Sequence, residues 1–315
     1  MKKILACLML VCGMVAVHAD EIPGNQDVKT DYRDVAEFQQ VVVNADFNVV
    51  IKYSVSPKVE VTAESNLLSH IVTEVKGKTL NVNVEKKTKL VPNFPIVITL
   101  SMPLINKFQY KGDGSIQTDA IPSDKMELIL DGKGSLKMNN LKTNSLKLTA
   151  TGFFHIEMAD VVSGGSKISL SDNVSGMYSN FSSSKLEIEY KTLESSNWKG
   201  IQSDALTING ESAGSMEFSG FAGKNVSVTM NSTGRVVMSG TASSVNVTAS
   251  NAGSFEAIML SAEKCKVVNN GTGDLSVNAT SSLDVTIASS GNVSFKGDLK
   301  ISYTNTGTGQ LVKKK

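Results

Sequence analysis

Eight short motifs, each a glycine, a polar residue and an apolar residue, decide the fold of this chain: Gly114-Ser115-Ile116, Gly134-Ser135-Leu136, Gly214-Ser215-Met216, Gly234-Arg235-Val236, Gly253-Ser254-Phe255, Gly273-Asp274-Leu275, Gly291-Asn292-Val293 and Gly309-Gln310-Leu311. Successive glycine positions differ by 20, 80, 20, 19, 20, 18 and 18. The interval of 80 corresponds to about four periods whose motifs are degraded. A short fixed period is typical of a solenoid, in which each repeat buries its apolar face only by stacking on its neighbours.

Apolar residues alternate around each glycine with the period of a β-strand. The column eight positions before the glycine includes Val245, Cys265, Leu283 and Ile301, and the column six before includes Val247, Val267, Val285 and Tyr303. Pairs such as Val236 and Met238 stand two and four positions after it. Spacing by two indicates strands, since a helix would repeat at three and four. Each coil is therefore predicted to be two short strands of inward-facing residues. They meet at a bend where a positive φ, or close contact with the next coil, excludes a Cβ.

The chain begins with a sequence typical of a secretory signal peptide. Lys2 and Lys3 form a charged start, residues 4–17 are apolar, and Ala19 ends a plausible cleavage site. The apolar segment is too short for a membrane span, and a charged start and a cleavage site flank it, as in a signal peptide. Export with cleavage after Ala19 is therefore expected, placing the mature protein in the periplasm, at the cell surface or outside the cell. Leu10-Val11-Cys12-Gly13 loosely resembles a lipobox, so a lipid anchor at Cys12 stays open as an alternative.

The composition excludes several classes of function. Cleavage removes two of the lysines and leaves one fewer basic residue than acidic residues. This near-neutral net charge does not indicate binding to nucleic acid. One remaining cysteine, Cys265, cannot form an internal disulfide or a zinc site and is expected to be a buried hydrophobic residue. The two remaining histidines, His70 and His155, form no metal or catalytic motif. The sequence therefore predicts no metal, no cofactor and no catalytic residue.

The first hundred residues keep the strand alternation but lack the glycine motif. We expect a signal peptide over 1–19, a loose N-terminus over 20–34, irregular β coils that cap the open end over 35–110, and regular repeats over 111–315. Helical spacing over 66–75 predicts a short helix or an irregular turn. With about 19 to 20 residues per coil, the mature chain would make on the order of 15 coils.

The opening block resembles a known secreted family. The segments that carry the resemblance are Tyr32-Arg33-Asp34-Val35-Ala36-Glu37-Phe38, Phe47-Asn48-Val49-Val50-Ile51, and the stretch from Val59 to Leu68, VEVTAESNLL. They are similar to the family once called a domain of unknown function and now described as putative auto-transporter adhesin, head GIN domain. The resemblance covers about residues 35–312. It implies a right-handed parallel β-helix, occurrence mainly in Bacteroidetes-like bacteria, no accepted catalytic residues and an inferred role in adhesion. The stretch 151–200 departs from the pattern, which leaves its coil register open.

Three functions are compatible with these observations. The first is a non-catalytic envelope or secreted protein that binds a surface glycan or a protein partner. The second is a polysaccharide lyase or hydrolase, which would need a positioned acid and base on one face. The polar column after the glycine holds Arg235 and Asp274 two coils apart, about 10 Å, which makes a poor acid–base pair. The third, a structural spacer, is not separated from the first by sequence.

A candidate binding patch lies where the repeat is disturbed. Residues 152–214 collect several aromatic side chains, including the only tryptophan, Trp198. Alternation places Trp198 and Tyr190 inward, as core residues. The hypothesis for a ligand site is that Tyr178, Phe181 and His155 line a shallow outward patch, since aromatic rings suit the apolar faces of sugars.

Overall fold

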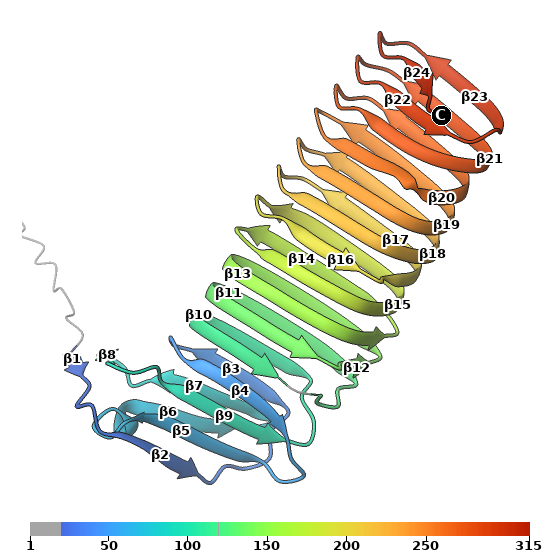
Figure 1. Cartoon of the computed structure of the whole chain (residues 1–315). Helices are drawn as coiled ribbons and strands as arrows, with labels where there is room; N and C mark the ends of the chain where they lie inside the picture. Colours follow the sequence, from blue (N-terminus) through green and yellow to red (C-terminus); the bar gives the residue numbers. More distant parts are fainter. Residues whose placement is uncertain (1–19, 119) are drawn as a thin grey trace, which may run out of the picture.

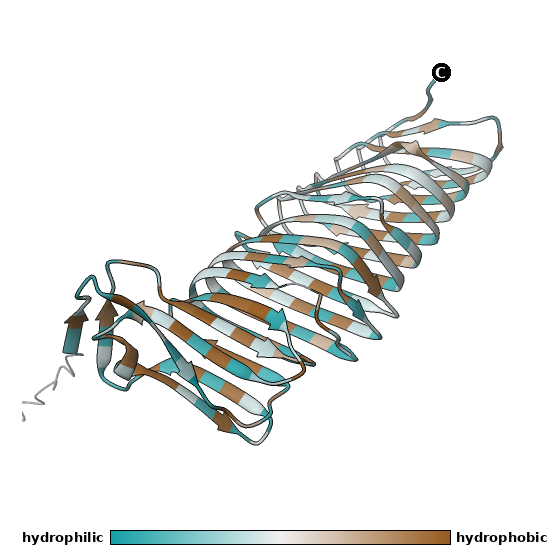
Figure 2. Ribbon diagram, turned by 60° about the horizontal axis from the view of Figure 1, so that its bottom comes forward, coloured by the Kyte–Doolittle hydropathy of each residue, from teal (hydrophilic) through white to brown (hydrophobic). Residues whose placement is uncertain are grey.

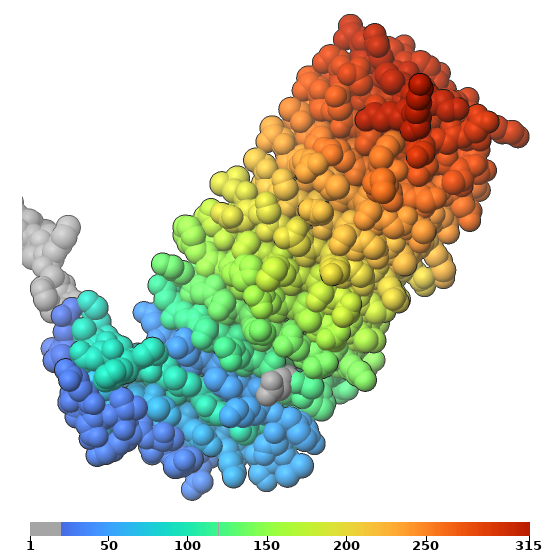
Figure 3. Space-filling view, in the orientation of Figure 1, coloured from blue at the N-terminus to red at the C-terminus, as the bar shows by residue number. Residues whose placement is uncertain are grey.

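The computed structural model describes residues 20–118 and 120–315. Strands make up 72% of the protein, and stacked parallel strands form a β-solenoid of about ten turns. Figure 1 shows the stack of coils beginning at a wider N-terminal cap. The bands of colour in Figure 3 show that each coil lies beside the coils next to it in the sequence. The predicted all-β parallel β-helix is confirmed. The predicted cleavage site after Ala19 and the alternative anchor at Cys12 lie outside the described residues.

The strands of the regular coils run around most of each turn. They are β10 (Lys107–Thr118), β11 (Lys125–Asn139), β12 (Lys142–Thr143), β13 (Ser145–Ser163), β14 (Ser166–Asp172), β15 (Ser175–Thr192), β16 (Ser196–Lys199), β17 (Gln202–Gly210), β18 (Ser215–Asn231), β19 (Arg235–Ser250), β20 (Ser254–Asn269), β21 (Leu275–Ile287), β22 (Val293–Lys296), β23 (Lys300–Asn305) and β24 (Leu311–Lys313). Figure 2 shows polar and apolar residues alternating along them, as a strand with one buried face requires.

The register confirms the predicted period. Leu128 lies opposite Leu148, Val228 opposite Val247 and Val267 opposite Val285, so the offset shortens slightly toward the C-terminus. The stretch 151–200 keeps this register throughout. Four coils of equal length fill the long interval between Gly134 and Gly214, with Phe154, Val174 and Glu194 standing where the other coils have the motif glycine. The coil there is regular, and only its motif is lost.

Close stacking, not a positive φ, explains most of the motif glycines. A Cβ on Gly273 would lie 2.0 Å from the carbonyl oxygen of Gly253, and one on Gly253 would lie 2.7 Å from that of Ser232. Neither glycine has a positive φ. The backbone of each coil therefore touches the coil before it at this first corner, where a side chain does not fit.

A second corner follows six positions after the motif glycine. Its residues have φ values of 51° to 69°, the left-handed region that Asn, Asp and Gly tolerate best. They are Asn140, Asp160, Asn180, Gly200 and Gly220, one in each successive coil. Each coil thus has a first side before the glycine, a second side after it, and a short third side beyond the second corner.

The N-terminal cap is built from hairpins as well as coils. Its elements are β1 (Asp20–Pro23), β2 (Val28–Arg33), β3 (Gln40–Asn44), β4 (Asn48–Tyr53), β5 (Lys58–Glu64), the 3-10 helix η1 (Leu68–His70), β6 (Ile71–Lys76), β7 (Thr79–Val84), β8 (Thr88–Val91) and β9 (Val97–Met102). β3 and β4 pair in parallel with β10, whereas β2, β5 and β6 pair antiparallel. Because these residues fold back on themselves, the solenoid has about ten turns, and the expected number of about 15 is wrong.

Residues 20–33 are also ordered, which corrects the expectation of a loose N-terminus. β1 pairs with β8, and β2 pairs with β5. Arg33 fixes β2 to the start of η1, because its guanidinium donates to the carbonyl oxygen of Leu68 at 2.7 Å. The helical spacing of 66–75 corresponds to the single turn of η1, and β6 follows it directly.

A buried carboxylate holds the first strands of the cap together. Glu64 is 1% exposed, and it accepts hydrogen bonds from the backbone N–H groups of Gln26 at 2.6 Å and Asn93 at 2.8 Å. The side-chain amide of Asn93 donates a third at 2.8 Å. Burial acts to raise the pKa of Glu64, but hydrogen bonds from Asn93, Gln26 and Phe94 outweigh it, so the pKa lies below the usual 4.5.

This lowered pKa predicts acid sensitivity of the cap. A carboxyl group whose folded pKa is depressed stabilises the fold above its unfolded pKa, and that contribution is lost as the pH falls through the folded pKa. We expect the melting temperature of Glu64→Gln to fall less than that of the wild type between about pH 6 and about pH 3. The exposed Glu37→Gln variant is the control and should follow the wild type. Parallel curves for the wild type and Glu64→Gln would contradict this role.

Candidate functional site

The structure places two residues of the predicted patch inside the solenoid. Tyr178 is 1% exposed and Phe181 is fully buried. Tyr178 follows Met158 and precedes Trp198 in one inward column, and Phe181 follows Val161 in another. The prediction that they line an outward patch is therefore wrong. The missing glycine at Phe154 obscures the register of these coils in the sequence.

His155 does lie on the outer surface, although without its predicted neighbours. It stands in the outward column between Ser135 and Ser175, with its side chain 45% exposed. Its Nδ1 lies 2.8 Å from the hydroxyl of Ser175, and its Nε2 lies 3.6 Å from the carboxylate of Glu157. A ligand role for His155 stays a prediction.

The aromatic residues of these coils form an internal stack. The ring centroid of Trp198 lies 3.8 Å from that of Tyr178 and 5.5 Å from that of Phe218, with interplanar angles of 10° and 14°. Phe181 meets the indole edge-on at 6.5 Å. The indole N–H donates to the hydroxyl of Ser196 at 2.9 Å. Trp198 and Tyr190 are core residues, as the alternation predicts, so these rings stabilise the coils and do not face a ligand.

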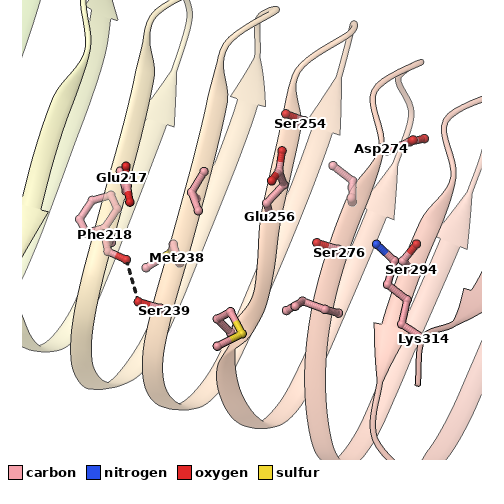
Figure 4. A pocket seen from close by; sticks show the side chains of 14 residues that line it. Glu217, Phe218, Met238, Ser239, Ser254, Glu256, Asp274, Ser276, Ser294 and Lys314 are labelled. Atoms are coloured by element: carbon pink, nitrogen blue, oxygen red, sulfur yellow. Dashed lines mark hydrogen bonds between the residues drawn. The ribbon is translucent and has the colours of Figure 1, made fainter.

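An open groove lies instead on the second side of the coils nearer the C-terminus. It has a volume of about 640 Å³ and crosses β18 to β22 (Figure 4). Its floor is made of short side chains, Val237, Ser254, Ser276 and Ser294, and Ser276 is only 9% exposed. Glu217 and Glu256 stand in the same outward row as Val237, Ser276 and Ser294, and Met259 and Lys314 also line the groove. We call this feature the second-side groove.

A bulge in β20 forms one wall of the groove. The register between β19 and β20 shifts after Val237, and that between β20 and β21 shifts after Ala257. The extra residues push Met259 outward, where it is 73% exposed. Bulges commonly occur beside active sites, where they redirect a side chain.

Two of the carboxylates that line the groove, Glu256 and Asp274, are held by hydrogen bonds. The guanidinium of Arg235 donates two hydrogen bonds of 2.6 Å to the carboxylate of Glu256. Arg235, together with the charge of Lys314, lowers the pKa of Glu256. Asp274 accepts the backbone N–H of Asn292 at 2.9 Å. These groups provide fixed acceptors and donors at neutral pH.

The carboxyl groups of the described residues show no upward pKa shift. A general acid at neutral pH needs a carboxyl group with a raised pKa. Over residues 20–118 and 120–315, every carboxyl group with a shifted pKa is shifted downward. Cys265 is buried, and burial raises the pKa of its thiol to about 12, so it is no nucleophile. In the same described ranges, no group of three His, Cys, Asp or Glu residues is placed to hold a metal.

Sequence reasoning does not find this groove. It depends on side chains from several coils and on the bulge at Met259, and neither is visible in one repeat. The available signal is the pair of short residues Ser276 and Ser294, three positions after the motif glycine of their coils, where the repeat period is shortest.

A family model described as "Putative auto-transporter adhesin, head GIN domain" matches residues 37–184 and 161–298. The chain belongs to this family. The two overlapping matches span both the cap and most of the coils, in agreement with the resemblance of the opening block. Membership supports an adhesion or binding role.

Several solved structures are similar to this GIN-domain protein. A putative adhesin from Bacteroides fragilis NCTC 9343 is 18% identical, with 93% of this chain and 100% of that chain covered and a TM-score of 0.36. A putative adhesin from Parabacteroides distasonis ATCC 8503 is 16% identical, with coverage of 94% and 100% and a TM-score of 0.36. A putative lipid binding protein from the same organism is 20% identical, with coverage of 94% and 100% and a TM-score of 0.30. Among curated proteins, none matches the chain. No helix within the described ranges is long and apolar enough to cross a membrane.

Proposed function

We propose that this GIN-domain protein is a non-catalytic, exported binding protein whose second-side groove holds a surface glycan. The observation that carries the proposal is the floor of serine hydroxyls, Ser254, Ser276 and Ser294, beside the fixed Arg235–Glu256 pair. Hydroxyls, carboxylates and a guanidinium can exchange hydrogen bonds with sugar hydroxyls in both directions. Val237 and Met259 add apolar contacts, the combination expected of a concave binding site.

An extended polymer suits the shape of the groove better than a small molecule does. The lining residues come from consecutive coils, and neighbouring strands lie about 4.8 Å apart. Figure 4 shows the labelled lining side chains following one another along the solenoid from Glu217 to Lys314. A chain of sugars lying along this axis would meet one outward side chain per coil, namely Glu217, Val237, Glu256, Ser276 and Ser294 in turn.

The alternative of a lyase or hydrolase on the same scaffold gains no support from the groove. Arg235 is held by Glu256, and Asp274 by a backbone N–H, so neither is free to serve as a base or an acid. The spacer alternative predicts that no glycan binds at all, and the following experiment separates it from the proposal.

A glycan-array screen of the mature protein tests the proposed function. We expect at least one class of glycan to bind, and we expect Ser276→Trp to weaken that binding by at least about tenfold, because an indole at position 276 fills the groove floor. The matched control is Ser227→Trp, which places the same ring on the exposed first side. Equal binding by the wild type and folded Ser276→Trp would place the site elsewhere, and absence of binding by the wild type would favour the spacer.

Export is the second part of the proposal. Intact-mass measurement of the protein from its native envelope should show a chain that begins at Asp20. Retention of residues 1–19 would refute the signal peptide, and a lipid adduct at Cys12 would establish the anchor instead.

A further inference from the structure

A second hollow lies at the first corner of the coils, just before the motif glycines. It has a volume of about 670 Å³, and its lining comes from the corners of four successive coils, so it follows the solenoid axis. The lining side chains are short and mostly polar, and they include Asn231, Thr233, Asn251, Ala252 and Thr272. We call this feature the first-corner hollow.

Four polar side chains of the hollow make no hydrogen bond to any described residue. They are the amides of Asn231 and Asn251 and the hydroxyls of Thr233 and Thr272, and all four residues are exposed. Amides and hydroxyls both donate and accept hydrogen bonds, so these groups can match sugar hydroxyls in either direction. The four residues come from three successive coils, so unpaired polar groups recur along the hollow.

The hollow suits an uncharged ligand that is not a polypeptide. Of the described residues that line it, only Glu211 carries a charge, and its carboxylate lies 2.9 Å from the ammonium group of Lys191. This pairing leaves no net charge to attract a charged polymer. An extended peptide binds through free backbone groups, whereas the N–H groups of Glu211 and Thr272 already donate to the preceding coil at 3.0 and 2.7 Å. Unpaired amides and hydroxyls beside the small side chain of Ala252 favour a neutral sugar.

The first-corner hollow and the second-side groove meet at the row of motif glycines. Ala252 lines the hollow and Ser254 lines the groove, with Gly253 between them. Thr272 and Asp274 flank the next motif glycine in the same way. Two residues of extended backbone span about 7 Å, so the two features run side by side along the same coils. A linear sugar chain that lies along the axis in one of them leaves the other empty, whereas a branch reaches across the corner.

We propose that the first-corner hollow is a second sugar subsite, which takes an uncharged branch of the glycan whose main chain lies in the second-side groove. This inference rests on the proposed function. The amides of Asn231 and Asn251 and the hydroxyls of Thr233 and Thr272 would exchange hydrogen bonds with the branch. Because the branch is covalently joined to the main chain, filling both sites raises the affinity without any new contact in the groove. The preferred ligand is therefore a glycan with neutral side branches.

Pairs of neutral glycans that share a backbone and differ only in side branches test this subsite. The probes are linear mannan with galactomannan, linear β-1,4-glucan with xyloglucan, and every other linear–branched pair on the array. We expect the branched member of at least one pair to bind the mature wild-type protein at least about tenfold more tightly than the linear member.

Thr233→Trp fills the hollow and separates the two sites. It should weaken binding of the branched member by at least about tenfold and change binding of the linear member by less than about twofold, whereas Ser276→Trp should weaken both. Asn231→Ala, which removes one amide without adding bulk, should weaken only the branched member as well. The matched control is Thr241→Trp, which places the same ring at an exposed position on the third side and should bind as the wild type does.

Three results would overturn the subsite while leaving glycan binding by the groove in place. The first is binding of linear members that their branched partners do not exceed in any pair. The second is unchanged binding of the branched member by folded Thr233→Trp or, if that variant does not fold, by Asn231→Ala. The third is a preference for branches that carry carboxylate or sulfate. Failure of the wild type to bind any glycan would instead refute the proposed function, and the subsite with it.

Discussion

Replacing Trp198 with alanine is expected to lower the free energy of unfolding by about 3–5 kcal/mol, since it removes a fully buried indole from a packed core. The loss is expected near the upper end of this range, because Tyr178 and Phe218 stack on both faces of the ring and cannot close the gap by small shifts. Denaturant titration followed by circular dichroism measures the change.

The control for this variant is Phe153→Ala, two coils away from Trp198. Phe153 is 61% exposed, so its removal should change the free energy of unfolding by no more than about 0.5 kcal/mol. A similar loss in both variants, or no loss in Trp198→Ala, would show that the indole faces solvent. The sugar-binding interpretation of these rings would then return.

Gly253→Val is expected to cost about 1–3 kcal/mol, whereas Ser254→Val should cost no more than about 0.5 kcal/mol. A Cβ at position 253 would lie 2.7 Å from the carbonyl oxygen of Ser232 and 3.0 Å from that of Gly234. The backbone of the preceding coil would have to move to admit it. Ser254, the next residue, is half-buried and faces the groove, where a valine fits.

Thermal unfolding of the two variants under identical conditions measures this difference. Equal melting temperatures would mean that the corner glycines are not in tight contact with the preceding coil. The expected order also separates close stacking from a turn requirement, because Gly253 has no positive φ to preserve.

Alternation alone predicts the core columns of the solenoid. The spacing to the motif glycine places Val245, Cys265 and Leu283 inward, and each is at most 4% exposed. This works because every coil repeats the same strand, so that a single anchor residue fixes the orientation of all the others.

The same logic fails where the anchor residue is missing. Phe154, Val174 and Glu194 replace the glycine in three coils, and the sequence pattern therefore assigns Tyr178 and Phe181 to the wrong face. The left-handed second corner, which passes through Asn180, fixes that register. Its residues recur once in each coil, and only Asn, Asp and Gly occupy it over 140–220.

The groove and the cap depend on contacts that no repeat period encodes. Met259 lines the groove because of the bulge in β20. The bulge arises because β20 pairs with strands of neighbouring coils that have fewer residues at this point. The order of residues 20–33 depends on pairing with strands that are distant in the sequence and on the buried carboxylate of Glu64. Local pattern cannot specify either feature.

A crystal structure of the mature protein with a glycan identified on the array tests the central claim most directly. We predict the sugar chain in the second-side groove, in contact with Ser276 and the Arg235–Glu256 pair, with Trp198 still enclosed in the core. A sugar chain bound on the first side, or at His155, with the groove empty would contradict this account.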